Sequence, residues 1–84
     1  MRLEGRTAFI TGAAKGIGLS VAKAFSEEGA KVFLADLSGA DAEREAAEIH
    51  AKTGNKALGM ECDVADNKSI EKAILTAADE LGDI

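Results

Sequence analysis

The stretch Thr11-Gly12-Ala13-Ala14-Lys15-Gly16-Ile17-Gly18 decides the fold of this 84-residue chain. It follows the apolar run Thr7-Ala8-Phe9-Ile10 and opens a pattern of apolar residues at helical spacing, which predicts a strand, a glycine-rich turn and the start of a helix. The first N–H groups of a helix have no partner within the helix and carry the positive end of its dipole. Since glycines let an anion approach this backbone closely, the stretch predicts a phosphate-binding turn.

An acidic residue follows at the end of the next apolar run. Residues 31–35 form this run, and Asp36 ends it, 24 positions after Gly12. In dinucleotide-binding folds an acidic side chain about 20 residues past the glycines accepts hydrogen bonds from the adenosine ribose. The simpler alternatives are glycines that serve only the turn and an aspartate that is only a surface charge. Together the two features favour a dinucleotide site, in which Gly12 makes the tight turn, Gly16 admits the cofactor and Gly18 lets the helix pack closely on the strand.

The remaining sequence predicts an alternation of strands and helices. We expect strands at residues 7–11, 31–36 and about 56–62, the last weakened by Gly59, and helices at about 16–28, 38–52 and 66–81. The first two strands are apolar at their centres, as parallel strands that are covered on both faces are. Helical spacing predicts an inward-facing stripe on each helix: Ile17, Val21, Ala24 and Phe25; Ala42, Ala46 and Ile49; and Ile70, Ile74, Ala77 and Leu81.

The spacing of the glycines is G-x-x-x-G-x-G rather than G-x-G-x-x-G. With Thr11 in front, it resembles the T-G-x-x-x-G-x-G signature of the short-chain dehydrogenase/reductase family. Asp36 at the end of the second strand, Cys62-Asp63-Val64 at the end of the third, and residues 81–84, which look like the lead-in to a fourth strand, extend the resemblance from Leu3 to Ile84. It implies an α/β fold, a Rossmann-type doubly wound parallel sheet of which the first β-α-β-α-β-α half is present, with the strands in the order 3-2-1.

The resemblance covers about the first third of a family member of ordinary size. We therefore expect residues 1–84 to be the N-terminal half of a dinucleotide-binding domain, with the catalytic half absent from this chain. The complete protein is expected to be an oxidoreductase that transfers hydride between nicotinamide and an alcohol or carbonyl substrate. The family's Tyr-x-x-x-Lys pair, serine and asparagine lie beyond the fourth strand, and the chain contains no tyrosine. No catalytic residue and no metal ligand is expected within these 84 residues, and the chain alone is expected to be inactive.

The resemblance also implies cofactor contacts outside the glycines. The Ile17 N–H is expected nearest the pyrophosphate, with the Ile17 side chain still in the core, and Leu37 lies beside the ribose-binding aspartate. Asp63 is expected to contact the adenine amino group and the backbone of Val64 a ring nitrogen. The alternative for Asp63 is a purely local role in a loop or helix cap.

Two charges bear on the choice between NAD and NADP. Asp36 favours NAD, because its carboxylate would face the extra 2′-phosphate of NADP as a like charge. Lys15 in the glycine turn argues the other way, since a basic residue there pairs with the 2′-phosphate in some NADP-using relatives; alternatively it is a solvated loop charge. We expect NAD as the cofactor, because the carboxylate would lie beside the ribose itself.

Composition limits the partners. The net charge of −5 leaves no basic stripe for nucleic acid or an anionic membrane, and no apolar run is long enough to span a bilayer. A single cysteine, Cys62, excludes an internal disulfide and favours a buried side chain in a cytoplasmic protein, and His50 has no second metal ligand at a suitable spacing. Because the first strand lacks a partner on one side, we expect a homo-oligomer or association through the open sheet edge.

Two other functions fit the sequence less well. The chain could be a non-catalytic fragment that binds a nucleotide or another protein. It could also be an unrelated doubly wound module of flavodoxin type, but the phosphate loop of that type lacks this glycine spacing.

Overall fold

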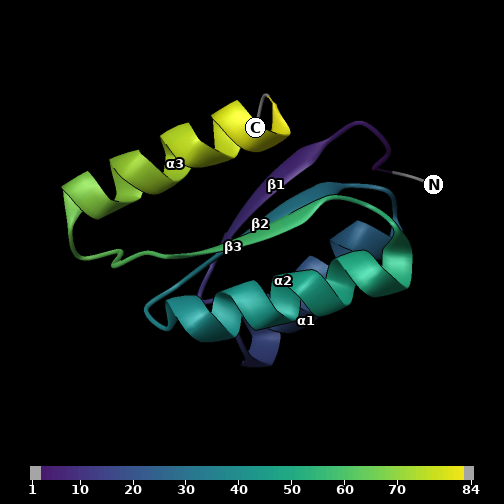
Figure 1. Cartoon of the computed structure of the whole chain (residues 1–84), viewed down its shortest axis with the longest axis horizontal. Coiled ribbons are helices and arrows are strands. Elements are labelled where there is room, and N and C mark those ends of the chain that lie inside the picture. Colours follow the sequence, from purple (N-terminus) through teal and green to yellow (C-terminus); the bar gives the residue numbers. More distant parts are fainter. Residues whose placement is uncertain (1–2, 83–84) are drawn as a thin grey trace.

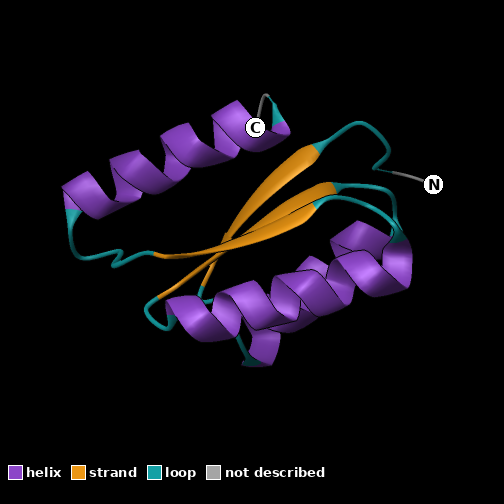
Figure 2. Cartoon of the chain, viewed as in Figure 1, coloured by secondary structure: helices purple, strands orange, loops and turns teal. Residues whose placement is uncertain are grey.

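The computed structural model describes residues 3–82, which form three strands and three helices in strict alternation (Figures 1 and 2). The elements are β1 (Thr7–Thr11), α1 (Gly16–Glu27), β2 (Lys31–Asp36), α2 (Gly39–Thr53), β3 (Ala57–Glu61) and α3 (Asn67–Leu81). The strands are parallel and lie in the order β1-β2-β3, with Phe9 opposite Phe33 and Phe33 opposite Leu58. The predicted fold class and strand order are confirmed, and β3 is shorter than predicted by one residue at each end.

The sheet lies between two helical layers. Helices α1 and α2 cover one face and α3 covers the other (Figures 1 and 2). Side chains alternate along β2, so that Val32 and Leu34 join the core under α1 and α2, whereas Phe33 and Ala35 join the core under α3. All four are at most 1% exposed, as predicted for a central strand.

Strand β1 is less buried than predicted. Its residues Thr7 to Ile10 are only half-buried, although they are as apolar as those of β2. The Phe9 ring stacks on the Phe33 ring at 5.2 Å between centroids, so one face of β1 is packed. The difference arises because β1 is an edge strand with a neighbour on one side only.

Gly59 has a packing role that the sequence did not reveal. A Cβ atom at this position would collide with the backbone carbonyl group of Ala42 in α2. Gly59 is paired in register with Leu34, so the strand continues through it. The glycine is present because α2 lies directly against β3.

The predicted inward stripe is confirmed for α2 and wrong for α1. Ala42, Ala46 and Ile49 are at most 2% exposed. In α1, by contrast, Ala22 and Ser26 are buried, while Ile17 is 85% and Phe25 38% exposed. The prediction failed because this helix packs closely against the sheet through small residues, and its larger apolar residues lie on another side.

Helix α3 shows the same effect more mildly. Ala77 and Leu81 are buried as predicted and Ile70 packs against them, but the third inward position belongs to Ala73. Ile74 is 42% exposed. The helix starts at an N-cap, Asp66, whose carboxylate accepts a hydrogen bond from the Lys68 N–H at 3.0 Å.

Several other predictions can be checked. Cys62 is buried and forms no disulfide, and His50 is exposed, with its Nδ1 2.9 Å from the Asn55 carbonyl oxygen. Among residues 3–82 no helix has the length and apolar character that crossing a bilayer requires. Asp83 and Ile84, part of the predicted lead-in to a fourth strand, lie outside the described residues.

Candidate functional site

The predicted site residues gather at one edge of the sheet. Because the strands are parallel, all three carboxyl ends lie at this edge, where the glycine turn follows β1, Asp36 ends β2 and Asp63 follows β3. The Cys62 N–H donates to the Asp36 carbonyl oxygen at 2.8 Å and extends the pairing of β2 and β3 to this edge. In open α/β sheets, ligands bind outside the carboxyl ends of the strands.

Two different structural requirements explain the three glycines of the turn. Gly12 and Gly16 have φ angles of +60° and +64°, a conformation that L side chains rarely adopt, and open space lies where a Cβ atom would project from either. Gly18 has no such angle, but a Cβ atom there would collide with the Gly12 carbonyl group. Gly18 therefore allows α1 to pack against the turn, while the other two glycines shape its open side.

The amides of the turn divide into two groups. The Ala13 N–H donates to the Ala35 carbonyl oxygen at 3.2 Å, and the Ala14 N–H donates to the Asp36 carboxylate. Within residues 3–82 the amides of Gly16, Ile17 and Gly18, the first three of α1, have no hydrogen-bond acceptor. These three amides can donate to an anion at the helix N-terminus, so the turn fits a phosphate group.

Asp36 is held at both carboxylate oxygens. Oδ2 accepts the Ala14 N–H at 3.1 Å, and Oδ1 accepts the Ser38 N–H at 3.0 Å. A carboxylate offers about four acceptor positions, so two remain for a ligand. The structure thus brings together a phosphate-binding turn and a partly free carboxylate, which is the arrangement that binds the phosphate and ribose of a nucleotide.

Comparison with known proteins gives the family. Residues 6–84 match the model of the short chain dehydrogenase family. The chain belongs to this family. It is 42% identical over 84 residues to a 1-deoxy-11-beta-hydroxypentalenate dehydrogenase of Streptomyces exfoliatus, 43% identical over 84 residues to a sorbitol dehydrogenase of Cereibacter sphaeroides, and 44% identical over 84 residues to a galactitol 2-dehydrogenase of Agrobacterium fabrum. Each match covers 100% of this chain but only 30 to 31% of the relative.

Two exposed apolar residues follow the two aspartates in this short-chain dehydrogenase chain. Leu37 is 68% and Val64 58% exposed, next to Asp36 and Asp63 respectively. The predicted core position of the Ile17 side chain is wrong, since it is 85% exposed; only its backbone can serve the predicted site.

Asp63 has local partners. Its Oδ1 accepts the Ala65 N–H at 2.9 Å, and its own N–H donates to the Ser69 hydroxyl at 2.9 Å. This is the local loop role considered as the alternative, and it occupies only one oxygen of the carboxylate. Oδ2 makes no hydrogen bond within residues 3–82, so an adenine contact is compatible with the loop role.

Lys15 lies within electrostatic range of the start of α2. The pKa of Asp41 is held below its ordinary value first by a hydrogen bond from the Ser38 side chain, then by Arg44, and to a smaller extent by the charge of Lys15. Arg44 Nη1 lies 2.8 Å from Asp41 Oδ1, and this pairing raises the pKa of Arg44. The sequence did not indicate the two amides that hold Asp36, because backbone donors cannot be recognised from residue type. The Asp41–Arg44 pair was also missed, although its i, i+3 spacing in a helix could have indicated it.

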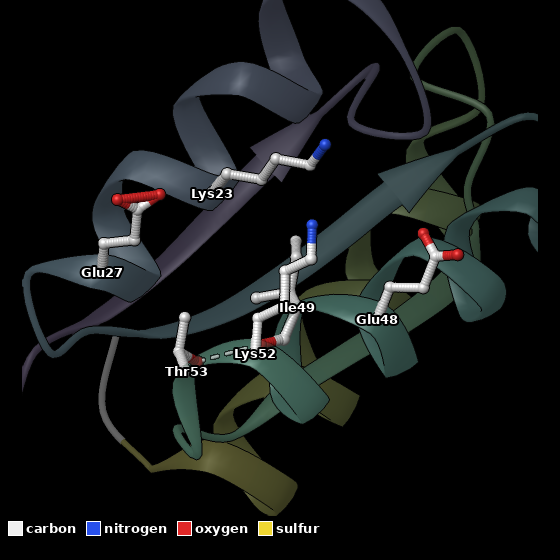
Figure 3. A pocket seen from close by; sticks show the side chains of 6 residues that line it. All are labelled: Lys23, Glu27, Glu48, Ile49, Lys52 and Thr53. Carbon is white, nitrogen blue, oxygen red and sulfur yellow. Dashed lines mark hydrogen bonds between the residues drawn. The ribbon is translucent and has the colours of Figure 1, made fainter.

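A separate pocket lies between α1 and α2 (Figure 3). It measures about 270 Å³ and is lined by Lys23, Glu27, Glu48, Ile49, Lys52 and Thr53. These residues belong to the C-terminal halves of the two helices, so the pocket is at the opposite edge of the sheet from the glycine turn. Its charged side chains are all exposed. The Thr53 hydroxyl, which lines it, lies 2.8 Å from the Ser26 hydroxyl. None of the predicted site residues lines it.

Proposed function

We propose that residues 1–84 form the cofactor-binding half of the dinucleotide-binding domain of an NAD(H)-dependent oxidoreductase, which transfers hydride between nicotinamide and a small alcohol or carbonyl substrate. The observation that carries the proposal is the hydrogen bond of 3.1 Å between the Ala14 N–H and Asp36 Oδ2, which joins the ribose acceptor to the phosphate turn. The matched relatives are dehydrogenases, two of them named for the sugar alcohols sorbitol and galactitol. The chain spans about 30% of their length.

Each predicted residue then has a separate task. The amides of Gly16, Ile17 and Gly18 would bind the pyrophosphate, and the two free acceptor positions of Asp36 would bind the ribose hydroxyls. Asp63 Oδ2 would accept from the adenine amino group, with Leu37 and the Val64 backbone beside the ring. The nicotinamide supplies the hydride chemistry when the cofactor is bound. The residues of this chain bind and orient the adenosine half.

The preference for NAD follows from the way Asp36 is held. Rotating its carboxylate away from a 2′-phosphate would break the hydrogen bonds to Ala14 and Ser38. NADP would therefore meet a fixed negative charge, whereas NAD presents two hydroxyl donors to it. Lys15 in the turn could offset this charge, but the Asp36 carboxylate would lie beside the ribose itself.

The proton donor would come from outside these residues. The family's catalytic tyrosine has no counterpart in a chain without tyrosine, so we propose that residues 1–84 alone bind the cofactor but do not turn it over. A reducing compartment, the cytoplasm, suits the free thiol of Cys62. We further propose that copies associate through the uncovered edge of β1.

Substitution of two glycines tests the proposed site. Gly16→Ala adds a methyl group on the open side of the turn, and we expect it to weaken NADH binding at least about tenfold, which is about 1.4 kcal/mol. Gly54→Ala is the matched control, because Gly54 also has a positive φ of +77° and open space around it, but ends α2. Both changes strain the backbone by about 1 to 2 kcal/mol.

The measurement is calorimetric titration of the full-length protein with NADH, together with its melting temperature. The proposal requires that the two variants lose similar stability and that only Gly16→Ala loses affinity. Equal NADH affinity in Gly16→Ala and the parent protein would rule out the glycine turn as the binding site.

A further inference from the structure

The Asp36 carboxylate makes a long-range contact that a ribose acceptor does not need. Its Oδ2 accepts the N–H of Ala14, which is 22 positions away in the sequence, at 3.1 Å. Ala14 is only 6% exposed, so water has little access to this part of the turn. The same carboxylate accepts the Ser38 N–H, at the N-cap of α2, through Oδ1.

We propose that Asp36 is a positioning residue that fastens the glycine turn in its ligand-binding conformation, in addition to any contact with the ribose. The turn is fixed at three points: the Ala13 N–H on the Ala35 carbonyl, the Ala14 N–H on Asp36, and the Gly12 carbonyl against Gly18. The first and third are backbone contacts that almost any sequence with these glycines retains. Only the second depends on a side chain.

This contact determines which amides face the ligand. Two consecutive N–H groups, those of Ala13 and Ala14, point to the end of β2 and are used there. The N–H groups of Gly16, Ile17 and Gly18 remain without acceptors within residues 3–82, at the N-terminus of α1. If the Ala14 amide were released, the turn could rotate, and the donors beyond it would lose their common orientation. Asp36 would therefore act on the phosphates through the backbone, as well as on the ribose directly.

Amide exchange in the ligand-free protein tests the contact itself. Without Asp36, the Ala14 N–H loses a charged acceptor, so we expect NMR to show its exchange accelerated at least about tenfold in Asp36→Asn and Asp36→Ala. Asp41→Asn is the matched control, because it removes a nearby carboxylate that bonds Arg44 and not the turn. The Leu34 amide, in the centre of the sheet, reports whether each variant is folded. Asp36→Asn removes the charge but keeps one acceptor oxygen, so Asp36→Leu, which has a similar size and no acceptor, replaces Asp36→Ala if that variant does not fold.

A ligand without ribose hydroxyls separates the two roles of Asp36. This part rests on the proposed function. ADP and 2′,3′-dideoxy-ADP differ only in the hydroxyls that Asp36 would bind directly. A residue that served the ribose alone would leave the affinity for the dideoxy ligand unchanged on Asp36→Asn. We expect that affinity to fall at least about fivefold, and that for ADP to fall further, while Asp41→Asn weakens neither.

The possible outcomes test the role of Asp36 in holding the turn separately from the proposed function. Accelerated exchange of Ala14 with loss of dideoxy-ADP affinity supports the inference. Unchanged Ala14 exchange in a folded variant with no acceptor at position 36, Asp36→Ala or Asp36→Leu, overturns it, even if the protein binds NADH. Accelerated exchange in a protein that binds no adenine nucleotide would confirm the fastening of the turn and reject the proposed function.

Discussion

At the scale of single residues, two aspartates at the carboxyl edge of the sheet differ in what holds them. Asp36 accepts one hydrogen bond from the distant glycine turn and one from Ser38. Among residues 3–82 the Asp63 carboxylate accepts only from Ala65, two residues along the chain. A carboxylate held from two sides keeps its position when a ligand arrives, so its charge discriminates between ligands. Asp36 is therefore the residue on which the choice of cofactor should depend.

We expect the full-length protein to bind NAD at least about tenfold more tightly than NADP, which is about 1.4 kcal/mol. Asp36→Ala should reduce this preference, because it removes both the hydroxyl acceptor and the repulsion of the 2′-phosphate. Leu37→Arg should move it further toward NADP by adding a positive charge at an exposed position. Titration of the parent protein and both variants with each cofactor measures the ratio.

Lys15→Ala is the control for this prediction. If Lys15 only lies in solvent beside Asp41, the ratio of the two affinities should hardly change. Equal or tighter binding of NADP that is lost in Lys15→Ala would mean that Lys15 sets the cofactor and that Asp36 does not.

The sequence could predict which residues reach the site, but not how they are held there. Gly12 and Gly16 could be predicted because a positive φ angle favours glycine. Asp36 could be predicted because it is an acidic residue at the end of an apolar run, at a typical distance from the glycines. The Ala14 and Ser38 amides were not found, because every residue except proline has such a donor. The orientation of Asp36 could therefore come only from the three-dimensional structure.

At the scale of elements, the size of a residue was a poor guide to the buried face of a helix. The predicted stripe was right for α2, where Ile49 is buried, and wrong where alanine and serine face the sheet. The side that α1 buries is made of small residues: Ala22 and Ser26 are 0% exposed, and Gly18 lies where a Cβ atom would meet the Gly12 carbonyl group of the turn. A helix that approaches a sheet so closely buries small residues and leaves larger ones, such as Ile17 and Ile74, at the side.

A matched pair of substitutions tests this assignment. Ile49→Ala in α2 removes a side chain that is 2% exposed and should lower the free energy of unfolding by about 2 to 5 kcal/mol. Ile74→Ala makes the same chemical change in α3, which also has 15 residues, but at a side chain that is 42% exposed. We expect it to cost less than about 1 kcal/mol. Urea unfolding of both variants measures the difference, and equal losses would contradict the burial pattern of α3.

At the scale of the whole molecule, the chain has a three-layer architecture in which the sheet is thinly covered. Its two apolar cores lie on opposite faces of three strands, and β1 has an open edge. The order of the elements was predictable, because alternating strands and helices with short connections permit few topologies. The partial burial of β1 was not, although its open edge was expected, because apolar residue types do not show how much of an edge strand stays exposed.

A polypeptide of these 84 residues should bind cofactor without catalysing a reaction. It contains no tyrosine to donate a proton. We expect no oxidation of NADH with any ketone or aldehyde, measured as the loss of absorbance of the reduced cofactor. The full-length protein is the positive control. Turnover by the purified polypeptide would mean that another residue of this chain can supply the proton.

The same polypeptide should associate with itself through one side. Lys23 and Glu27 line the pocket against α2, so helical geometry puts Val21 and Phe25 on the opposite side of α1, toward the free edge of β1. Ile17, which is 85% exposed, continues this apolar side. Apolar side chains beside an unpaired parallel strand favour association. Because the helices cover the sheet only thinly, the polypeptide should melt below about 60 °C.

Two lysine substitutions locate the contact. Ile17→Lys places a charge on the side of α1 that faces away from α2, and it should shift the polypeptide toward monomer in sedimentation experiments. Leu75→Lys is the matched control, because Leu75 is 71% exposed but belongs to α3, which covers the other face of the sheet (Figure 1). Association that is weakened equally by both substitutions would point to general hydrophobic aggregation. A parent polypeptide that stays monomeric at high concentration and melts sharply above about 60 °C would show that the chain folds stably without a partner at the edge of β1.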